Sequence, residues 1–176
     1  MAEQRTTRRQ ALRTAGATAL AGGAALAGAQ GAAAAGDQGL AGSWQGTVTA
    51  TDPPLGSFTS LFTFTPDGSV VEARRLYLPD SPFGPLLETP GHGSWERVGP
   101  RTYAISFRFL LQGAPDNAAF RGQDLGTDNV RWQPTLDRST ARLSGPFQSD
   151  VKDPGGAVVF TARGTVTAMR IAVERL

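Results

Sequence analysis

Seven turn signals at regular spacing restrict the fold of this chain more than any other feature. The segments are rich in Pro, Gly, Asp and Asn, and they are residues 52–56, 66–68, 79–90, 99–101, 113–117, 137–139 and 153–156. Gly adopts positive φ and Pro fixes φ at a value that turns use, so these segments reverse the chain. The eight stretches between and beside them are rich in Val, Ile, Thr, Phe, Tyr and Trp, which is typical of strands.

Alternation within these stretches favours strands over helices. In "RTYAISFRFLLQ" the aromatic and aliphatic residues Tyr103, Phe107 and Leu111 fall on one face, and Arg108 falls on the other. The stretches "SFTSLFTFTPDG" and "TARLSGPFQSDVKD" alternate in the same way. A period of two turns one face of a strand toward the core and the other toward water. No stretch after residue 36 combines helical spacing with a helix cap.

Short connections imply that consecutive strands pair antiparallel in a meander. An open eight-stranded meander would leave two edges of unpaired backbone groups, and closure removes both. We therefore predict an all-β fold: an eight-stranded antiparallel up-and-down barrel without a C-terminal helix. A barrel of this size either fills with side chains or holds one small ligand. A two-sheet sandwich is the alternative.

The N-terminal segment resembles a twin-arginine (Tat) export signal. Arg8 and Arg9 are the arginine pair of the motif "TRRQALR" (residues 7–13), in which Ala11 replaces the usual Phe. A Gly-interrupted Ala-rich stretch follows at 15–29, and residues 32–35 offer A-x-A cleavage sites. We expect residues 1–35 to be a cleaved signal and 36–176 to be one domain in the cell envelope or outside the cell. The Tat machinery would be the precursor's partner, and no membrane span is predicted in the mature protein.

Composition excludes several classes of function. Four of the 17 Lys and Arg residues and one of the 15 Asp and Glu residues precede residue 36, so residues 36–176 carry 13 basic and 14 acidic side chains. A nearly neutral domain gives no long-range attraction to nucleic acid. The absence of Cys from the sequence excludes a thiol nucleophile and a thiolate zinc site.

The sequence also resembles the lipocalins and the wider calycin barrels. Gly42-Ser43-Trp44 matches their G-x-W motif at the start of the first strand. The resemblance implies that Trp44 closes one barrel end and that a basic residue of the last strand packs over it, either Arg170 or Arg163. The T-D-Y-type motif and the C-terminal helix of lipocalins are not visible.

A closer resemblance is to a group of secreted bacterial lipocalin-like proteins of unassigned function. It rests on the G-x-W motif and on "LFTFTPDGSVVE", "PGHGSWERVGPRTYAISF" and "GTVTAMRI", and it spans most of residues 40–174. It implies the barrel fold and names no activity.

Motifs for catalysis are few. The single histidine excludes a multi-histidine metal site, and no G-x-S-x-G, Walker or G-x-G-x-x-G motif occurs. No metal or cofactor is predicted. The weak acid–base candidates are His92, Glu72, Glu96 and Tyr103, with His92 expected at the barrel rim. The oxygen-rich stretch "FRGQDLGTDN" and the preceding Asp116 and Asn117 lack EF-hand spacing and are interpreted as a solvated bend.

One of the neighbouring residues Arg74 and Arg75 must lie on the less exposed face of its strand. A buried arginine needs an acidic partner or an anionic ligand, and we expect the acidic partner. The aromatic residues either fill the core or line an open cavity. The candidate ligand-lining residues are Phe62, Phe64, Tyr77, Trp95, Tyr103, Phe107 and Phe109.

Three functions follow from this reading. The first is an exported lipocalin-like barrel that binds a small apolar or amphipathic molecule in its lumen. The second is a barrel enzyme of the isomerase or cyclase type, by analogy of fold with allene oxide cyclase-like barrels, with acid–base residues at the barrel mouth. The third is a cell-envelope interaction module with a packed core. Ionisable side chains that converge in the lumen would favour an enzyme, and a large exposed apolar patch would favour the module.

Overall fold

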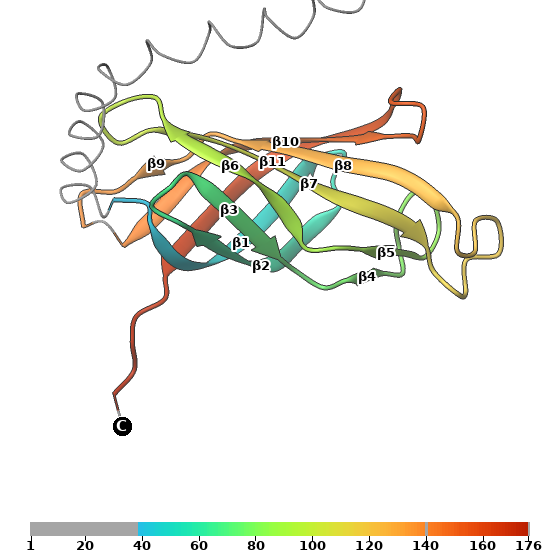
Figure 1. Ribbon diagram of the computed structural model, residues 1–176, viewed down its shortest axis with the longest axis horizontal. Coiled ribbons are helices and arrows are strands. Elements are labelled where there is room, and N and C mark those ends of the chain that lie inside the picture. The colour runs from blue at the N-terminus through green and yellow to red at the C-terminus, as the bar shows by residue number, and fades with distance from the viewer. Residues whose placement is uncertain (1–38, 140, 176) are drawn as a thin grey trace, which may run out of the picture. The chain divides into compact units, whose positions relative to one another are not determined.

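The computed structural model describes residues 39–139 and 141–175, so the predicted signal with Arg8 and Arg9 lies outside the described part. Eleven strands are present in this part (Figure 1). They are β1 (Gly42–Asp52), β2 (Gly56–Phe64), β3 (Ser69–Ala73), β4 (Tyr77–Leu78), β5 (Leu86–Glu88), β6 (Gly91–Arg97), β7 (Tyr103–Gly113), β8 (Asp124–Trp132), β9 (Thr135–Leu136), β10 (Arg142–Lys152) and β11 (Val158–Arg170). The described residues form no helix, and therefore none that could cross a membrane.

The eleven strands occupy eight positions around a closed antiparallel barrel. Their order is β1-β2-β3-β6-β7-β8-β10-β11, and the pairing of β11 with β1 closes the ring. Three of the eight barrel strands are each divided into two shorter strands: β3 and β4, β5 and β6, and β8 and β9. The predicted eight-stranded meander barrel is confirmed, and the sandwich alternative is excluded.

Prolines account for two of the interruptions. Pro90 lies between β5 and β6, and Pro134 lies between β8 and β9. Proline has no N–H to donate to a ladder, so pairing stops locally and the strand bends. The predicted turn over 79–90 was too long, because β5 (Leu86–Glu88) lies within it and pairs with β4 and β7.

A glycine allows the barrel wall to bend where β8 begins. Gly126 has φ +90°, and a Cβ built on it would lie 2.0 Å from the carbonyl oxygen of Lys152 on β10. Any larger residue would therefore push the two strands apart and would also strain the backbone.

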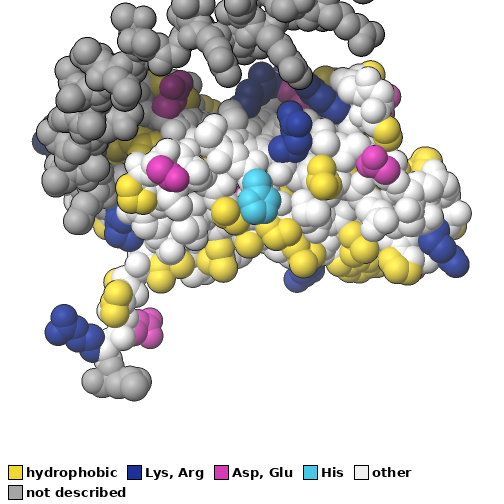
Figure 2. All heavy atoms as spheres, viewed as in Figure 1, with side chains coloured by type: hydrophobic (Ala, Val, Ile, Leu, Met, Phe, Trp, Pro, Cys, Tyr) yellow, Lys and Arg dark blue, Asp and Glu magenta, His cyan; other side chains and the backbone are white. Residues whose placement is uncertain are grey.

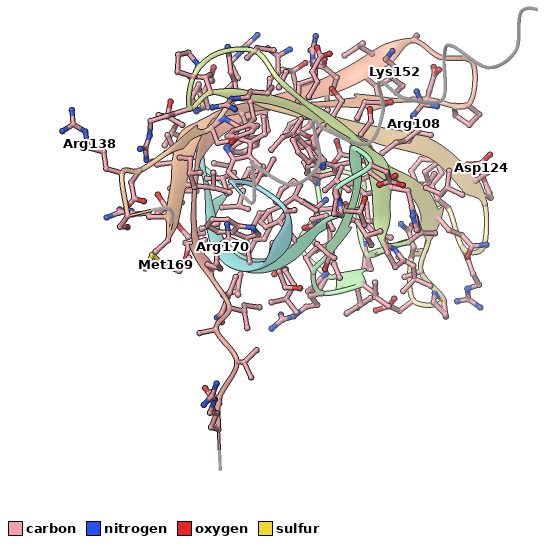
Figure 3. All side chains as sticks on the ribbon, turned by 60° about the vertical axis from the view of Figure 1, so that its left-hand side comes forward. Arg108, Asp124, Arg138, Lys152, Met169 and Arg170 are labelled. Carbon is pink, nitrogen blue, oxygen red and sulfur yellow. The ribbon has the colours of Figure 1, made fainter. Side chains whose placement is uncertain are left out.

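The two ends of the barrel differ. The end where β1 begins and β11 ends, here called the closed end, is plugged by large buried side chains. Among them are Leu40, Trp44, Phe64, Tyr103, Leu136 and Leu143. The other end, here called the open end, carries the connections 53–55, 79–85, 114–123 and 153–157. In Figure 3, Arg170 lies at the closed end and Asp124 and Lys152 lie toward the opposite end.

Candidate functional site

A cavity of about 620 Å³ occupies the open half of the barrel. Its floor includes Phe62, Phe107 and Trp132, and it extends to Leu55 and to the connection 79–85 at the open end. Most of its wall is apolar. The apolar residues include Val48, Ala50, Leu78, Leu86, Leu111, Val130, Val151, Phe160, Ala162 and Val166. The volume lies within the range of small-molecule binding pockets.

A cluster of charged side chains forms one wall of this cavity, with Arg74 at its centre. Arg74 Nε donates to Glu88 Oε2 at 2.7 Å, and Nη2 donates to Glu88 Oε1 at 2.8 Å. Nη2 also lies 3.2 Å from Asp128 Oδ2. The Arg74 guanidinium carbon lies 4.2 Å from the centroid of the Phe109 ring and 5.1 Å from that of Phe58. These contacts hold the guanidinium on an aromatic surface with a bidentate carboxylate partner.

Strand alternation brings these residues together. Val70 and Glu72 point inward from β3, and Arg74 follows in the same phase just beyond the strand. Glu88 lies on β5 and pairs with Leu111, and Asp128 lies on β8 and pairs with Phe109. Both acids therefore reach Arg74 from strands that border β7.

Glu72 is the member of the cluster with unused hydrogen-bonding capacity. Its side chain is 1% exposed, and Oε1 accepts a short hydrogen bond from Ser60 Oγ. Oε2 is buried and makes no hydrogen bond within the part of the chain that the structure describes. A buried oxygen without a partner is costly to a folded protein, so it marks a place where a ligand or water can bind.

The electrostatics of the cluster raise the pKa of both glutamates. Burial raises the pKa of Glu72 to about 7, although the nearby Arg74 charge and the Ser60 hydrogen bond lower it. Burial also raises the pKa of Glu88, and Arg74 opposes this effect. For Arg74, burial would lower the pKa, but the Glu88 and Asp128 charges outweigh it and the guanidinium remains charged.

Trp132 adds a second unpaired polar atom to the lining of the same cavity, among the described residues. Its Nε1 is buried and has no acceptor among the described residues. Its ring centroid lies 5.1 Å from that of Phe62, and Phe62 is the cross-strand partner of Glu72. An unused acceptor and an unused donor therefore line the same cavity.

The connection 79–85 borders the cavity at the open end. Phe83 contacts Phe160 edge to face with centroids 6.2 Å apart. Asn117 holds this connection in place, because its Nδ2 donates to the carbonyl oxygens of Phe83 at 3.0 Å and Pro85 at 2.8 Å. Asn117 is 2% exposed, so interpreting residues 116–129 as a solvated bend was wrong for Asn117 and for the buried Asp128.

The seven candidate ligand-lining aromatics occupy different environments. Phe62 and Phe107 line the cavity. Phe64 and Tyr103 are buried at the closed end, and Phe109 is buried beneath Arg74. Trp95 packs against the core from β6, with Nε1 donating to Thr65 O at 3.1 Å, and Tyr77 is exposed, with its hydroxyl donating to Asp116 at 2.6 Å.

The four acid–base candidates do not converge. Only Glu72 lines the cavity. His92 (Figure 2) and Glu96 both point outward from β6 and are exposed, and Tyr103 is buried at the closed end. The expectation that His92 lies at the rim was wrong. It lies within the wall, paired with Val71 on one side and Arg108 on the other.

Arg170 packs over Trp44 at the closed end, with its guanidinium carbon 4.3 Å from the indole centroid. It also donates to the carbonyl oxygens of Ala41 and Gly39, each at 2.7 Å. Trp44 Nε1 donates to Leu40 O at 2.9 Å. Arg163, the alternative basic residue, instead lies 3.4 Å from Asp52.

Four polar residues of the lumen were not among the site residues predicted from the sequence: Ser60, Glu88, Asp128 and Ser149. Ser149 donates to Asp128 at 2.5 Å, which satisfies the oxygen that Arg74 does not contact. The phase of β8 could have revealed Asp128, because it alternates with Val130 and Trp132. No such phase was available for Glu88, which lies in a strand of three residues. Within residues 39–139 and 141–175, no group of three or more His, Asp or Glu side chains has the geometry of a metal site.

Comparisons with known proteins identify no family and no function for this chain. No family model and no curated protein matches the chain. Among solved structures, a redesigned β-barrel is similar, with 21% sequence identity, a TM-score of 0.40, and coverage of 76% of this chain and 93% of that chain.

Proposed function

We propose that this protein binds a small amphipathic molecule in the lumen of its barrel. One observation carries the proposal: a cavity of about 620 Å³ that combines an apolar wall with buried, unpaired polar atoms on Glu72 and Trp132. Ligand sites are commonly apolar clefts with a few polar groups that orient the ligand. The ligand's apolar body would pack on the β1 and β11 wall, and its polar group would reach Glu72.

The location and family are part of the same proposal. The twin-arginine motif at Arg8 and Arg9 supports export to the cell envelope or the medium. The G-x-W motif, with Arg170 packed over Trp44, supports kinship with lipocalin-like barrels. An exported carrier or scavenger of a small molecule is consistent with both features.

Substitutions on one strand test where binding occurs. Ala162 is buried in the cavity wall on β11, and Thr165 is exposed on the same strand. Ala162→Trp would fill part of the lumen, whereas Thr165→Trp places the same ring on the outer surface. The probe is 1-decanol, titrated calorimetrically into the full chain.

We expect Ala162→Trp to weaken 1-decanol binding at least about tenfold and Thr165→Trp to leave it within about twofold, since a tenfold change corresponds to 1.4 kcal/mol of lost contact. Thermal unfolding of both variants shows whether they are folded. Equal binding by a folded Ala162→Trp variant and the unsubstituted protein would exclude the lumen as the site.

The ionisable side chains that converge in the lumen, Glu72 with Arg74, Glu88 and Asp128, favour a second candidate function, an isomerase or cyclase. A carboxyl with a pKa of about 7 in a cavity can both accept and return a proton near neutral pH. Native mass spectrometry of the protein purified from its host would identify a retained molecule. Incubating fresh protein with that molecule separates the functions: a binding protein returns it unchanged, whereas an enzyme converts it and loses the conversion on Glu72→Gln substitution.

A further inference from the structure

The charges that line the lumen do not balance. Two arginines and four acids line the cavity. Arg75 and Asp80 are exposed, which leaves Arg74, with a side chain 12% exposed, as the inner cation against three buried acids: Glu72, Glu88 and Asp128. Nε and Nη2 of Arg74 are already used by Glu88 and Asp128. Nη1 makes no hydrogen bond to a described residue, but an anion placed there would also face two carboxylates that already neutralise the guanidinium. The wall is therefore unfavourable for a ligand carboxylate or phosphate.

The atom best placed to receive a ligand is instead an acceptor. Glu72 Oε2 is buried and has no partner among the described residues, and the same carboxyl group already accepts a hydrogen bond from Ser60 through Oε1. The rings of Phe62, Phe107 and Trp132 line the same cavity, and Phe62 is the cross-strand partner of Glu72. The Phe62 centroid lies 5.1 Å from that of Trp132 and 6.2 Å from that of Phe107. A carboxylate beside several aromatic rings is a favourable environment for a desolvated ammonium group.

We propose, building on lumen binding as the protein's function, that the cavity selects amphipathic amines, with the ligand ammonium group paired to Glu72 Oε2 and its apolar body against the β1 and β11 wall. An alkyl alcohol of the same length binds more weakly because it carries no charge. A fatty acid of the same length binds most weakly because its carboxylate would lie beside Glu72. The ammonium adds the positive charge that the cluster lacks.

Amine binding should depend on the ionisation of Glu72. The charged groups that face Glu72 are Arg74 of the same wall, Glu88 of β5 and Asp128 of β8, and Ser60 of β2 donates to it. With a pKa of about 7, Glu72 is mostly neutral at pH 6 and mostly ionised at pH 8. An alkylammonium, like lysine, stays protonated over this range. Affinity for an amine should therefore rise from pH 6 to pH 8, and amine binding at pH 7 should release protons.

Calorimetric titration of the full chain with three ligands of one chain length tests the proposal. The probes are decylamine, 1-decanol and decanoate. At pH 8 we expect decylamine to bind at least about tenfold more tightly than 1-decanol, with decanoate weaker than both. From pH 8 to pH 6, decylamine affinity should fall about tenfold, and 1-decanol affinity should stay within about twofold.

A pair of conservative variants assigns the effect. Glu72→Gln keeps the side-chain volume, so it should abolish the pH dependence of decylamine binding while retaining 1-decanol binding. Glu96→Gln, on the outer face of β6, should leave both unchanged. Decanoate binding as tight as decylamine binding, or decylamine affinity that does not change with pH in the unsubstituted protein, would overturn amine selection while lumen binding stands. If none of the three probes binds at pH 8, both proposals fail.

Discussion

The closed and open halves of this barrel are built on opposite principles. At the closed end, Trp44 is fully buried, its one polar atom is bonded to Leu40 O, and Arg170 covers the ring. In the open half, by contrast, a cavity is bordered by the buried charges of Glu72, Arg74 and Glu88. The closed half is filled by large apolar side chains, although Arg101 Nη2 is buried there without a partner among the described residues, and the open half retains charged groups that apolar side chains could replace.

This difference supports the proposal that the open half carries the function. Buried ion pairs contribute little net stability, because the desolvation of the charges offsets their attraction. Folding alone therefore does not require Arg74 inside the barrel, and it does not require an unpaired oxygen on Glu72. Strained or costly groups that persist in a fold are expected where a ligand uses them. The closed half can then be read as the scaffold and the open half as the site.

The largest expected effect is at the closed end. Trp44→Ala removes a fully buried indole and leaves Arg170 without its aromatic partner. We expect the free energy of unfolding to fall by about 3–5 kcal/mol, measured by urea denaturation. Arg170→Ala keeps the indole and should have a smaller effect of about 1–2 kcal/mol. A loss below 1 kcal/mol for Trp44→Ala would show that the closed end is not the main source of stability.

In the open half, the effect of a substitution should depend on whether charge is left unbalanced. Arg74→Met leaves Glu88 and Asp128 without their cationic partner. We expect the free energy of unfolding to fall by about 3–5 kcal/mol at pH 8. The combined variant Arg74→Met, Glu88→Leu, Asp128→Leu removes all three charges and should recover most of that loss. Urea denaturation of both variants makes the comparison. A combined variant as unstable as the single one would mean that the cluster itself stabilises the fold.

The pH dependence of the free energy of unfolding tests how strongly burial affects Glu72. Burial raises the pKa of Glu72 from 4.5 to about 7, so the folded state binds more protons than the unfolded state between these values. Stability should therefore fall as pH rises from about 5 to 8, with Glu72 contributing at most about 3 kcal/mol of the decrease. Glu72→Gln should flatten the curve by that amount, whereas Glu88 acts equally in both proteins. Parallel curves for the two proteins would place Glu72 in a more solvated setting.

The sequence predicted the closed half far better than the open half. Turn residues and alternation set the strand number, and the G-x-W motif led to Trp44 and its basic neighbour, because both signals are local. The site depends on side chains from β3, β5 and β8 that meet only after closure. The phase of β3 was ambiguous because Glu72 and Arg74 lie on the same face as Val70, and an inward-facing charge looks like an outward-facing one until its partners are known.

The smallest expected effect concerns the single histidine. His92 lies on the outer face of β6, exposed and flanked by Val71 and Arg108, away from the lumen side of the wall (Figure 2). We expect His92→Ala to change the free energy of unfolding by less than about 0.5 kcal/mol, and to leave decylamine and 1-decanol affinities within about twofold. Calorimetry and urea denaturation measure both. Glu72 lies on the adjoining strand β3 and faces the lumen. Comparing ligand affinity in Glu72→Gln and His92→Ala therefore compares the inner and outer faces of the same part of the barrel wall. A His92→Ala variant that folds normally yet loses ligand binding would move the site from the lumen to the outer surface and would undo the assignment of function to the cavity.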